Sequence, residues 1–139
     1  MDTTTHQHPL PRLLRPAGGI RALGRLGEDL AARHLAEDGL EILARNWRIS
    51  DGQLRGELDL VAVEPATGTL VVCEVKTRRD AARFGGATAA LDPRKLRRLR
   101  ALTAAFLREQ PHRFAHVRLD LVAVDLGSPA SLTHLVGLG

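Results

Sequence analysis

The chain has 139 residues, of which 44% are hydrophobic and 26% charged, and this length and composition favour one globular domain. No apolar run approaches the roughly 18 residues that a membrane helix needs, the N-terminal segment lacks the apolar core of a signal peptide, and the single cysteine, Cys73, excludes an intramolecular disulfide. The net charge of +4 is modest, and together these features predict a cytoplasmic protein with no membrane partner.

The N-terminal part of the sequence predicts a tail followed by a helix. Residues 1–19 contain Thr, Pro and Gly without apolar periodicity, so we expect a disordered or loosely docked tail and a single domain over residues 20–139. From Arg21 to Asp38, leucine and alanine recur at helical spacing, and Gly39 follows as a stop signal. Glu28 lies at the edge of the apolar stripe of this helix, where it borders the core and can reach a cleft.

Three strands are predicted after this helix. In "LEILARNWR" the alternation of Leu40, Ile42 and Ala44 predicts a first strand, and Trp47 and Arg48 lead into a polar turn, "SDGQLRG". The second and third strands, at about 57–63 and 69–77, form a hairpin closed by "PATG".

A second helix is predicted to begin at "DP", residues 92 and 93, where Asp is an N-cap and Pro suits the first helical position. The preceding "RFGGATAAL" is expected to be a flexible loop. The stretch "HVRLDLVAVD" alternates strongly and predicts a fourth strand, and a short final strand is an option near 132–136. The predicted fold class is therefore α/β with the order αβββαβ.

Positive charge is concentrated in one segment. From 76 to 100 there are nine basic and two acidic residues, a net charge of +7, which leaves −3 for the rest of the chain. This segregation favours a face that binds a polyanion, although a solvated arginine-rich helix surface explains the charge equally well. Aromatic residues make up only 3%, so we expect contacts with phosphates rather than base stacking. The candidate phosphate-binding residues are Arg78, Arg79, Lys95, Arg97 and Arg98.

The predicted hairpin carries four charged residues among apolar ones. With "PATG" as its loop, directly opposed residues have numbers that sum to 133, so Asp59 faces Glu74 and Glu57 faces Lys76. Because alternate side chains share a face, Glu57 and Asp59 should lie together, with Leu58, Leu60 and Ala62 on the opposite face. A shift of one residue in register would move the charges of one strand to the other face.

The charges of this hairpin favour a metal site. The four side chains leave a net charge of −2 beside apolar neighbours, where unpaired carboxylates repel each other. A divalent cation would offset that charge, and carboxylate oxygens without Cys or His favour Mg²⁺ or Mn²⁺ over Zn²⁺. An acidic pair that holds Mg²⁺ near a lysine suits phosphodiester hydrolysis. The alternative is an exposed sheet face with ordinary cross-strand ion pairs.

The sequence also resembles a known family. "GELDLVA", "VVCEVKTR" and "RLDLVAV", with "GEDLAARHLAEDGLEILARN" before them, look like the bacterial YraN-like family over about Arg21 to Val124. That family of predicted endonucleases belongs to the restriction-endonuclease-like PD-(D/E)xK superfamily and is similar to archaeal Holliday-junction resolvases. The resemblance implies a restriction-endonuclease-like core with a central mixed sheet flanked by helices, and a metal-dependent nuclease-like domain over residues 20–139 that acts on double-stranded or branched DNA.

The resemblance can be carried over residue by residue. It implies four catalytic residues, Glu28, Asp59, Glu74 and Lys76. The three acidic ones are implied to be metal ligands. Leu58 stands where the superfamily has its proline. Two roles stay open for Glu57, because it can ligate the metal or orient Lys76.

Two functions are consistent with these observations. The first is a Mg²⁺- or Mn²⁺-dependent endonuclease that hydrolyses phosphodiester bonds in DNA, with branched or junction DNA as one option. The second is a non-catalytic nucleic-acid-binding accessory module of a DNA-processing complex, and in both cases DNA is favoured over RNA. A purely structural protein with an ion-paired hairpin is a weaker third hypothesis. Because resolvase-like folds often dimerise, a homodimer is a further option.

Overall fold

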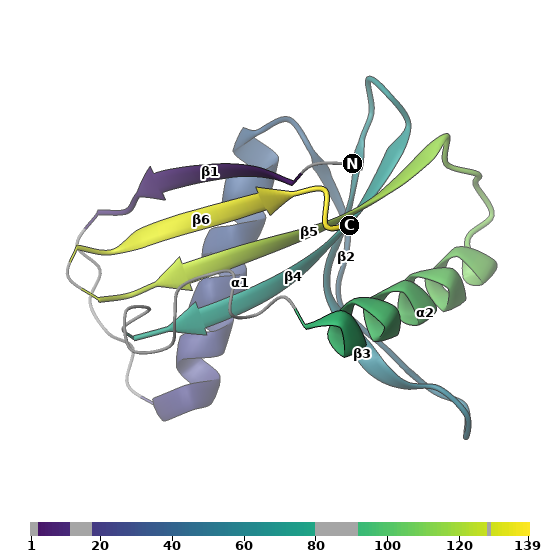
Figure 1. Cartoon of the computed structure of the whole chain (residues 1–139), viewed down its shortest axis with the longest axis horizontal. Coiled ribbons are helices and arrows are strands. Elements are labelled where there is room, and N and C mark those ends of the chain that lie inside the picture. The colour runs from purple at the N-terminus through teal and green to yellow at the C-terminus, as the bar shows by residue number, and fades with distance from the viewer. Residues whose placement is uncertain (1–2, 12–17, 80–91, 128) are drawn as a thin grey trace.

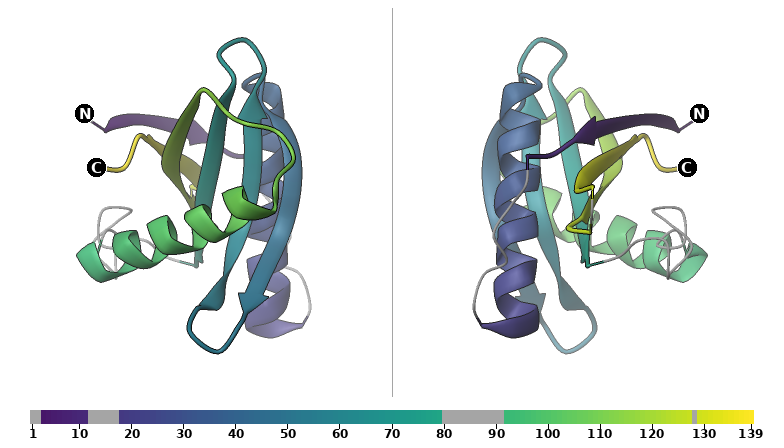
Figure 2. Two further views of the ribbon diagram at one scale, coloured as in Figure 1. Left: turned by 90° about the vertical axis from the view of Figure 1, so that its right-hand side faces the viewer. Right: turned by 90° about the vertical axis from the view of Figure 1, so that its left-hand side faces the viewer.

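The computed structural model describes residues 3–11, 18–79, 92–127 and 129–139. They form a six-stranded mixed sheet with helices α1 and α2 on opposite faces (Figure 1, Figure 2). The elements in chain order are β1 Thr4–Pro9, α1 Gly19–Glu37, β2 Glu41–Ser50, β3 Arg55–Glu64, β4 Thr69–Arg78, α2 Pro93–Glu109, β5 His116–Asp125 and β6 Ser131–Val136. The predicted α/β class and the order αβββαβ are confirmed and agree with a restriction-endonuclease-like core; β1 precedes this order and β6 follows it.

The sheet has the strand order β1-β6-β5-β4-β3-β2. Only β4 and β5 run parallel, and α2 lies in the connection between them, as the crossover between parallel strands requires. The other neighbouring strands are antiparallel. Strand β4 is therefore central, and its first five residues are fully or almost fully buried.

Each helix covers its own hydrophobic cluster. The α1 side includes buried residues from α1, β3 and β4: Ala31, Leu35, Leu60, Ala62, Val71 and Cys73. The α2 side includes buried residues from α2, β3 and β4: Leu58, Val61, Leu70, Val72, Leu99, Leu102 and Phe106. Helix α2 begins as predicted, since Asp92 Oδ1 accepts a hydrogen bond of 2.8 Å from Arg94 N and Pro93 occupies the first helical position.

Strand β1 differs from the sequence prediction. Thr4–Pro9 pairs antiparallel with β6, from Thr4 opposite Val136 to Pro9 opposite Ser131 (Figure 1). The expectation of a disordered or loosely docked tail therefore does not hold for these six residues. All six are exposed, so they lack the apolar alternation that would indicate a strand, and the pairing rests on the main chain at the edge of β6.

Strand β2 is longer than predicted. It continues to Ser50, so that Trp47 and Arg48, expected to lead into the turn, belong to the strand. The Trp47 ring packs edge-on against Phe106 of α2 at 5.5 Å between centroids, and Trp47 Nε1 donates to Glu109 Oε2 at 3.2 Å. These contacts tie the edge strand β2 to α2. Neither helix of the described residues is long and apolar enough to span a membrane.

Candidate metal and nucleic-acid site

The candidate site lies where β3 separates from β4. The predicted register is confirmed from Glu64 opposite Thr69 to Leu60 opposite Cys73, which are the last paired residues described. Past this point Asp59 Oδ2 accepts a hydrogen bond of 2.8 Å from Val75 N. The side chain of Asp59, rather than the main chain of β3, therefore accepts this N–H of β4. The pairs predicted beyond it, Asp59 with Glu74 and Glu57 with Lys76, are therefore not part of the paired register.

The alternation of side chains breaks at the same level. Leu58 packs on the α2 side of the sheet while Leu60 packs on the α1 side, although a regular strand would place both on one face. The predicted set of Leu58 with Leu60 and Ala62 is therefore wrong. On the neighbouring strand Asn46 has φ +52°, the only positive φ among the described non-glycine residues. In both β2 and β3, the regular alternation of side chains between the two faces of the sheet is therefore interrupted near Asn46 and Asp59.

This irregularity brings three carboxylates together. Oxygens of Glu28 from α1 and of Glu57 and Asp59 from β3 all lie within 4.8 Å of one another. Helix α1 approaches the sheet closely because Gly27 has no side chain: a Cβ there would lie 1.7 Å from Thr77 Oγ1. The glycine therefore lets the helix place Glu28 beside the two acidic residues of β3.

Asn46 joins the carboxylates to β2. With its amide nitrogen turned toward them, it donates to Glu57 Oε1 at 2.6 Å and to Glu28 Oε2 at 3.2 Å. Asparagine tolerates the left-handed backbone conformation better than most residues, and strained backbone of this kind is typical of functional sites. Asn46 is not among the residues that the sequence pattern predicts for the site. Its position in "ARNWR" gives no sign of a positive φ or of contact with residues on two other elements.

Glu74 and Lys76 lie on β4, next to the place where β3 and β4 separate, which we call the opening. They line a cavity of about 170 Å³ together with Glu57 of β3 and with Lys95 and Arg98 of α2. Glu74 is not one of the three clustered carboxylates. The structure thus places Glu28, Glu57 and Asp59 in one group and sets Glu74 and Lys76 next to it, with Glu57 bordering both.

The electrostatics show that negative charge is crowded here. Burial, followed by the charge of Glu74, raises the pKa of Asp59 from 3.8 to about 7, against the opposing hydrogen bond from Val75 N. Burial also raises the pKa of Glu74, while the charges of Lys76 and Lys95 act in the opposite direction. Each carboxylate thus costs free energy to ionise, and a cation would offset that cost.

Glu57 has partners other than Lys76. Arg48 Nε donates to Glu57 Oε2 at 3.0 Å, and Asn46 holds the other carboxylate oxygen. No ion pair between Glu57 and Lys76 is found among the described residues. Of the two roles left open for Glu57, the geometry therefore favours membership of the carboxylate group over orientation of the lysine.

Two of the five predicted basic residues border the cavity. Lys95, Arg97 and Arg98 are exposed at the start of α2, and Lys95 and Arg98 border the cavity while Arg97 does not. The Arg98 guanidinium donates to the main-chain oxygen of Arg55, which holds it over β3. At the end of β4, Arg78 is half-buried and the following Arg79 is exposed. The predicted loop at 83–91 lies outside the described residues.

Comparison with known proteins places the chain in a family. A family model described as "Uncharacterised protein family UPF0102" matches residues 27–124. This protein belongs to the UPF0102 family. A UPF0102 protein of Mycobacterium sp. (strain KMS) is 44% identical over 119 residues, which cover 84% of this chain and 84% of the relative.

Two further UPF0102 proteins have comparable sequence identity to this chain. The one from Mycobacterium ulcerans (strain Agy99) is 47% identical over 84% of this chain and 93% of its own. The one from Frankia casuarinae is 48% identical over 84% of this chain and 94% of its own. The region matched by the UPF0102 model includes every acidic residue of the candidate site, together with Asn46 and Lys76.

Proposed function

We propose that this UPF0102 protein is a Mg²⁺- or Mn²⁺-dependent endonuclease of the PD-(D/E)xK type that hydrolyses phosphodiester bonds in DNA. The observation that carries the proposal is the group formed by Glu28, Glu57 and Asp59 at the separation of β3 from β4, with Glu74 and Lys76 beside it. Carboxylates that can hold a divalent ion, with a lysine beside them, suit metal-dependent phosphodiester hydrolysis.

The residues present fit a hard divalent cation. The donors are carboxylate oxygens, which suit Mg²⁺ and Mn²⁺. The raised pKa of Asp59 and of Glu74 supports this assignment, because burial, followed by neighbouring carboxylates, makes ionisation of both groups costly and a bound cation would offset that cost. Asp59, Glu28 and Glu57 would hold the ion, with Glu74 adjacent. When bound, the ion supplies neutralisation of phosphate charge and a water of lowered pKa.

The protein's own side chains complete the site. The hydrogen bond from Val75 N fixes the carboxylate of Asp59, and Asn46 fixes those of Glu28 and Glu57, so these groups are preorganised. Lys76 borders the cavity next to Glu74, where its ammonium group can orient a water and stabilise charge on a phosphate oxygen.

The phosphate backbone would be held by α2. Lys95 borders the cavity at the second position after Pro93, where the free N–H groups of a helix start also favour an anion. Arg97 extends the positive surface away from the cavity. Contacts of this kind bind the backbone irrespective of sequence, so DNA structure rather than base sequence would determine the substrate.

A second candidate function is a nucleic-acid-binding accessory module without turnover. The exposed basic start of α2 favours it, since binding by Arg97 and its neighbours does not require the carboxylates. The two functions differ in one outcome. Only the endonuclease loses cleavage, and keeps DNA binding, when an acidic residue of the site is replaced.

Cleavage of a labelled substrate panel tests the proposal. The panel contains duplex, single strand, flap, four-way junction and RNA, each incubated with Mg²⁺, Mn²⁺ or EDTA. We expect metal-dependent cutting by the wild type, a loss of at least about 100-fold in Glu74→Ala and Lys76→Ala, and no loss in the control Glu41→Ala, whose glutamate is exposed at the start of β2. Binding without cutting under every metal would support the accessory module instead.

A further inference from the structure

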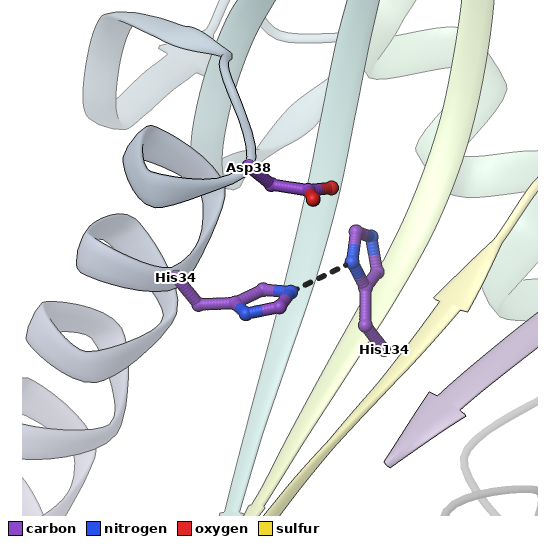
Figure 3. Close-up of side chains that lie close together, drawn as sticks. All are labelled: His34, Asp38 and His134. Atoms are coloured by element: carbon purple, nitrogen blue, oxygen red, sulfur yellow. Dashed lines mark hydrogen bonds between the residues drawn. The ribbon is translucent and has the colours of Figure 1, made fainter. Parts of the chain in front are cut away.

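A second group of metal-ligating side chains lies away from the carboxylates. His34 projects from the C-terminal half of α1, Asp38 follows the end of that helix, and His134 projects from β6 (Figure 3). Their ligand atoms all lie within 4.8 Å of one another. His34 Nε2 and His134 Nδ1 are 3.0 Å apart, as the dashed line in Figure 3 shows.

His134 is held in one orientation by a buried carboxylate. Its Nε2 lies 2.8 Å from Asp120 Oδ2, and its side chain is 1% exposed. Asp120 Oδ1 accepts hydrogen bonds from Arg118 Nε at 2.9 Å and from Gly137 N at 3.0 Å, and its Oδ2 accepts one from Arg118 Nη2 at 3.0 Å, so both carboxylate oxygens are acceptors. His134 Nε2 therefore carries the proton, and the lone pair of Nδ1 is directed at His34.

We propose that His34 Nε2, His134 Nδ1 and a carboxylate oxygen of Asp38 form a Zn²⁺ site. Two imidazole nitrogens and one carboxylate are a donor set that suits Zn²⁺, in contrast to the oxygen-only group around Asp59. A carboxylate that accepts the second ring N–H of a ligating histidine is a regular feature of zinc sites, and Asp120 is in that position behind His134.

The spacing of the donors needs only a small adjustment. Zn–N bonds of about 2.0–2.1 Å in a tetrahedral site separate two nitrogens by about 3.3 Å, so the rings of His34 and His134 would part by about 0.3 Å and turn until both nitrogens point at the ion. Zn²⁺ would replace the proton that His34 Nε2 now donates to His134 Nδ1, and that proton would be released or carried by His34 Nδ1 instead. Asp38 is exposed at the helix end, and its carboxylate can move toward the two nitrogens. Figure 3 shows this carboxylate on the same side of the helix as both rings.

The site also has a route for the ion. His34 borders a cavity of about 430 Å³ between α1 and β1, whose other lining residues include His8 and Leu132. Burial, followed by the charges of the neighbouring His134 and His8, lowers the pKa of His34. Bound there, Zn²⁺ would join α1 to β6, which are separated in sequence by β2 to β5.

The position of His34 on the apolar stripe of α1 favours a core histidine when the sequence is taken alone. The partner His134 lies 100 positions further along the chain, so the pairing becomes visible only in the folded protein. The zinc site does not depend on the proposed nuclease function, because its ligands lie outside the carboxylate group.

Zinc binding by the untagged, metal-depleted full chain tests the proposal. Competition with a chromogenic zinc chelator, in excess Mg²⁺ to occupy the carboxylate group, measures stoichiometry and affinity. We expect one Zn²⁺ per chain in the wild type and in the control His116→Ala, whose histidine is exposed at the start of β5. In His34→Ala we expect affinity to fall at least tenfold. In Asp120→Asn, whose residue is not a ligand, we expect a loss of about 10–100-fold.

Three outcomes would overturn the proposal: no stoichiometric Zn²⁺ in the wild type, undiminished binding by His34→Ala, or binding lost in Asp59→Asn but not in His34→Ala. Circular dichroism checks that each variant is folded. His34→Gln repeats the test with a side chain closer in size, in case the alanine variant is misfolded. A protein that binds Zn²⁺ through His34 but cuts no substrate would refute the nuclease and leave the zinc site in place.

Discussion

From the close contact between α1 and β4 we predict how Gly27→Ala changes the free energy of unfolding. A Cβ at position 27 would lie 1.7 Å from Thr77 Oγ1 and 2.8 Å from Thr77 Cβ. Rotation of the threonine side chain can relieve the first clash but not the second, because Cβ does not move when χ1 changes. Carbon atoms in contact are about 3.5–4.0 Å apart, so the helix must move away from the strand by about 1 Å.

The expected loss of stability follows from two opposing effects. Overpacking of this kind costs about 1–3 kcal/mol, while replacing a helical glycine by alanine contributes about 0.5–1 kcal/mol. We therefore expect Gly27→Ala to lower the free energy of unfolding by about 1–2 kcal/mol. The matched control is Gly24→Ala one turn earlier, where a Cβ would meet no atom within 4 Å and stability should rise by about 0.5–1 kcal/mol.

Urea unfolding of both variants without metal provides the measurement. Adding Thr77→Ala to Gly27→Ala removes the hydroxyl and the methyl group but keeps Cβ, so it should recover only part of the loss. A shift of about 1 Å would also displace Glu28, the next residue, and should reduce metal-dependent cleavage by about 100-fold. If Gly27→Ala were as stable as Gly24→Ala, the close approach of α1 to β4 would be refuted.

Three further predictions concern the carboxylates and the basic helix. Because the pKa of Asp59 is raised from 3.8 to about 7, the metal-free folded state keeps a proton that the unfolded chain releases, so stability should fall between about pH 4 and pH 7. Urea unfolding in EDTA should show a smaller fall in Asp59→Asn, and equal falls would contradict the assignment. Replacing Lys95 and Arg97 by Gln should reduce the slope of log K for DNA against log salt by about 1.8, and an unchanged slope would place the phosphate contacts elsewhere. Asn46→Gly suits φ +52° and should preserve stability but raise the Mg²⁺ concentration needed for cleavage, whereas wild-type Mg²⁺ dependence would show that the amide does not position Glu28 and Glu57.

The parts of the fold that could be predicted depend on local signals. The β3–β4 register follows from a four-residue loop and from two buried faces, which together make a shifted pairing costly. The start of α2 follows from Asp92 and Pro93, whose effects are confined to the first turn. In both cases residues within a few positions of one another determine the structure.

The parts that could not be predicted depend on distant partners. Strand β1 is polar and exposed, and it is a strand because β6 offers an edge more than a hundred residues later. Leu58 leaves the face expected from alternation because the backbone changes direction at Asp59 and Asn46. Neither change of direction has a signature in the amino-acid types alone, since asparagine and aspartate also occur in regular strands.

The failure of alternation and the candidate site have one physical cause. A regular β3 would pair Asp59 with β4 and keep Leu58 and Leu60 on one face, which would fill the opening with hydrogen-bonded backbone. Asp59 instead accepts the Val75 N–H through its side chain, and the strands part around it. The carboxylates can converge only because this pairing ends, and their crowding is the free-energy cost that a bound cation would offset. Local misfits between pattern and structure are expected at functional positions for this reason.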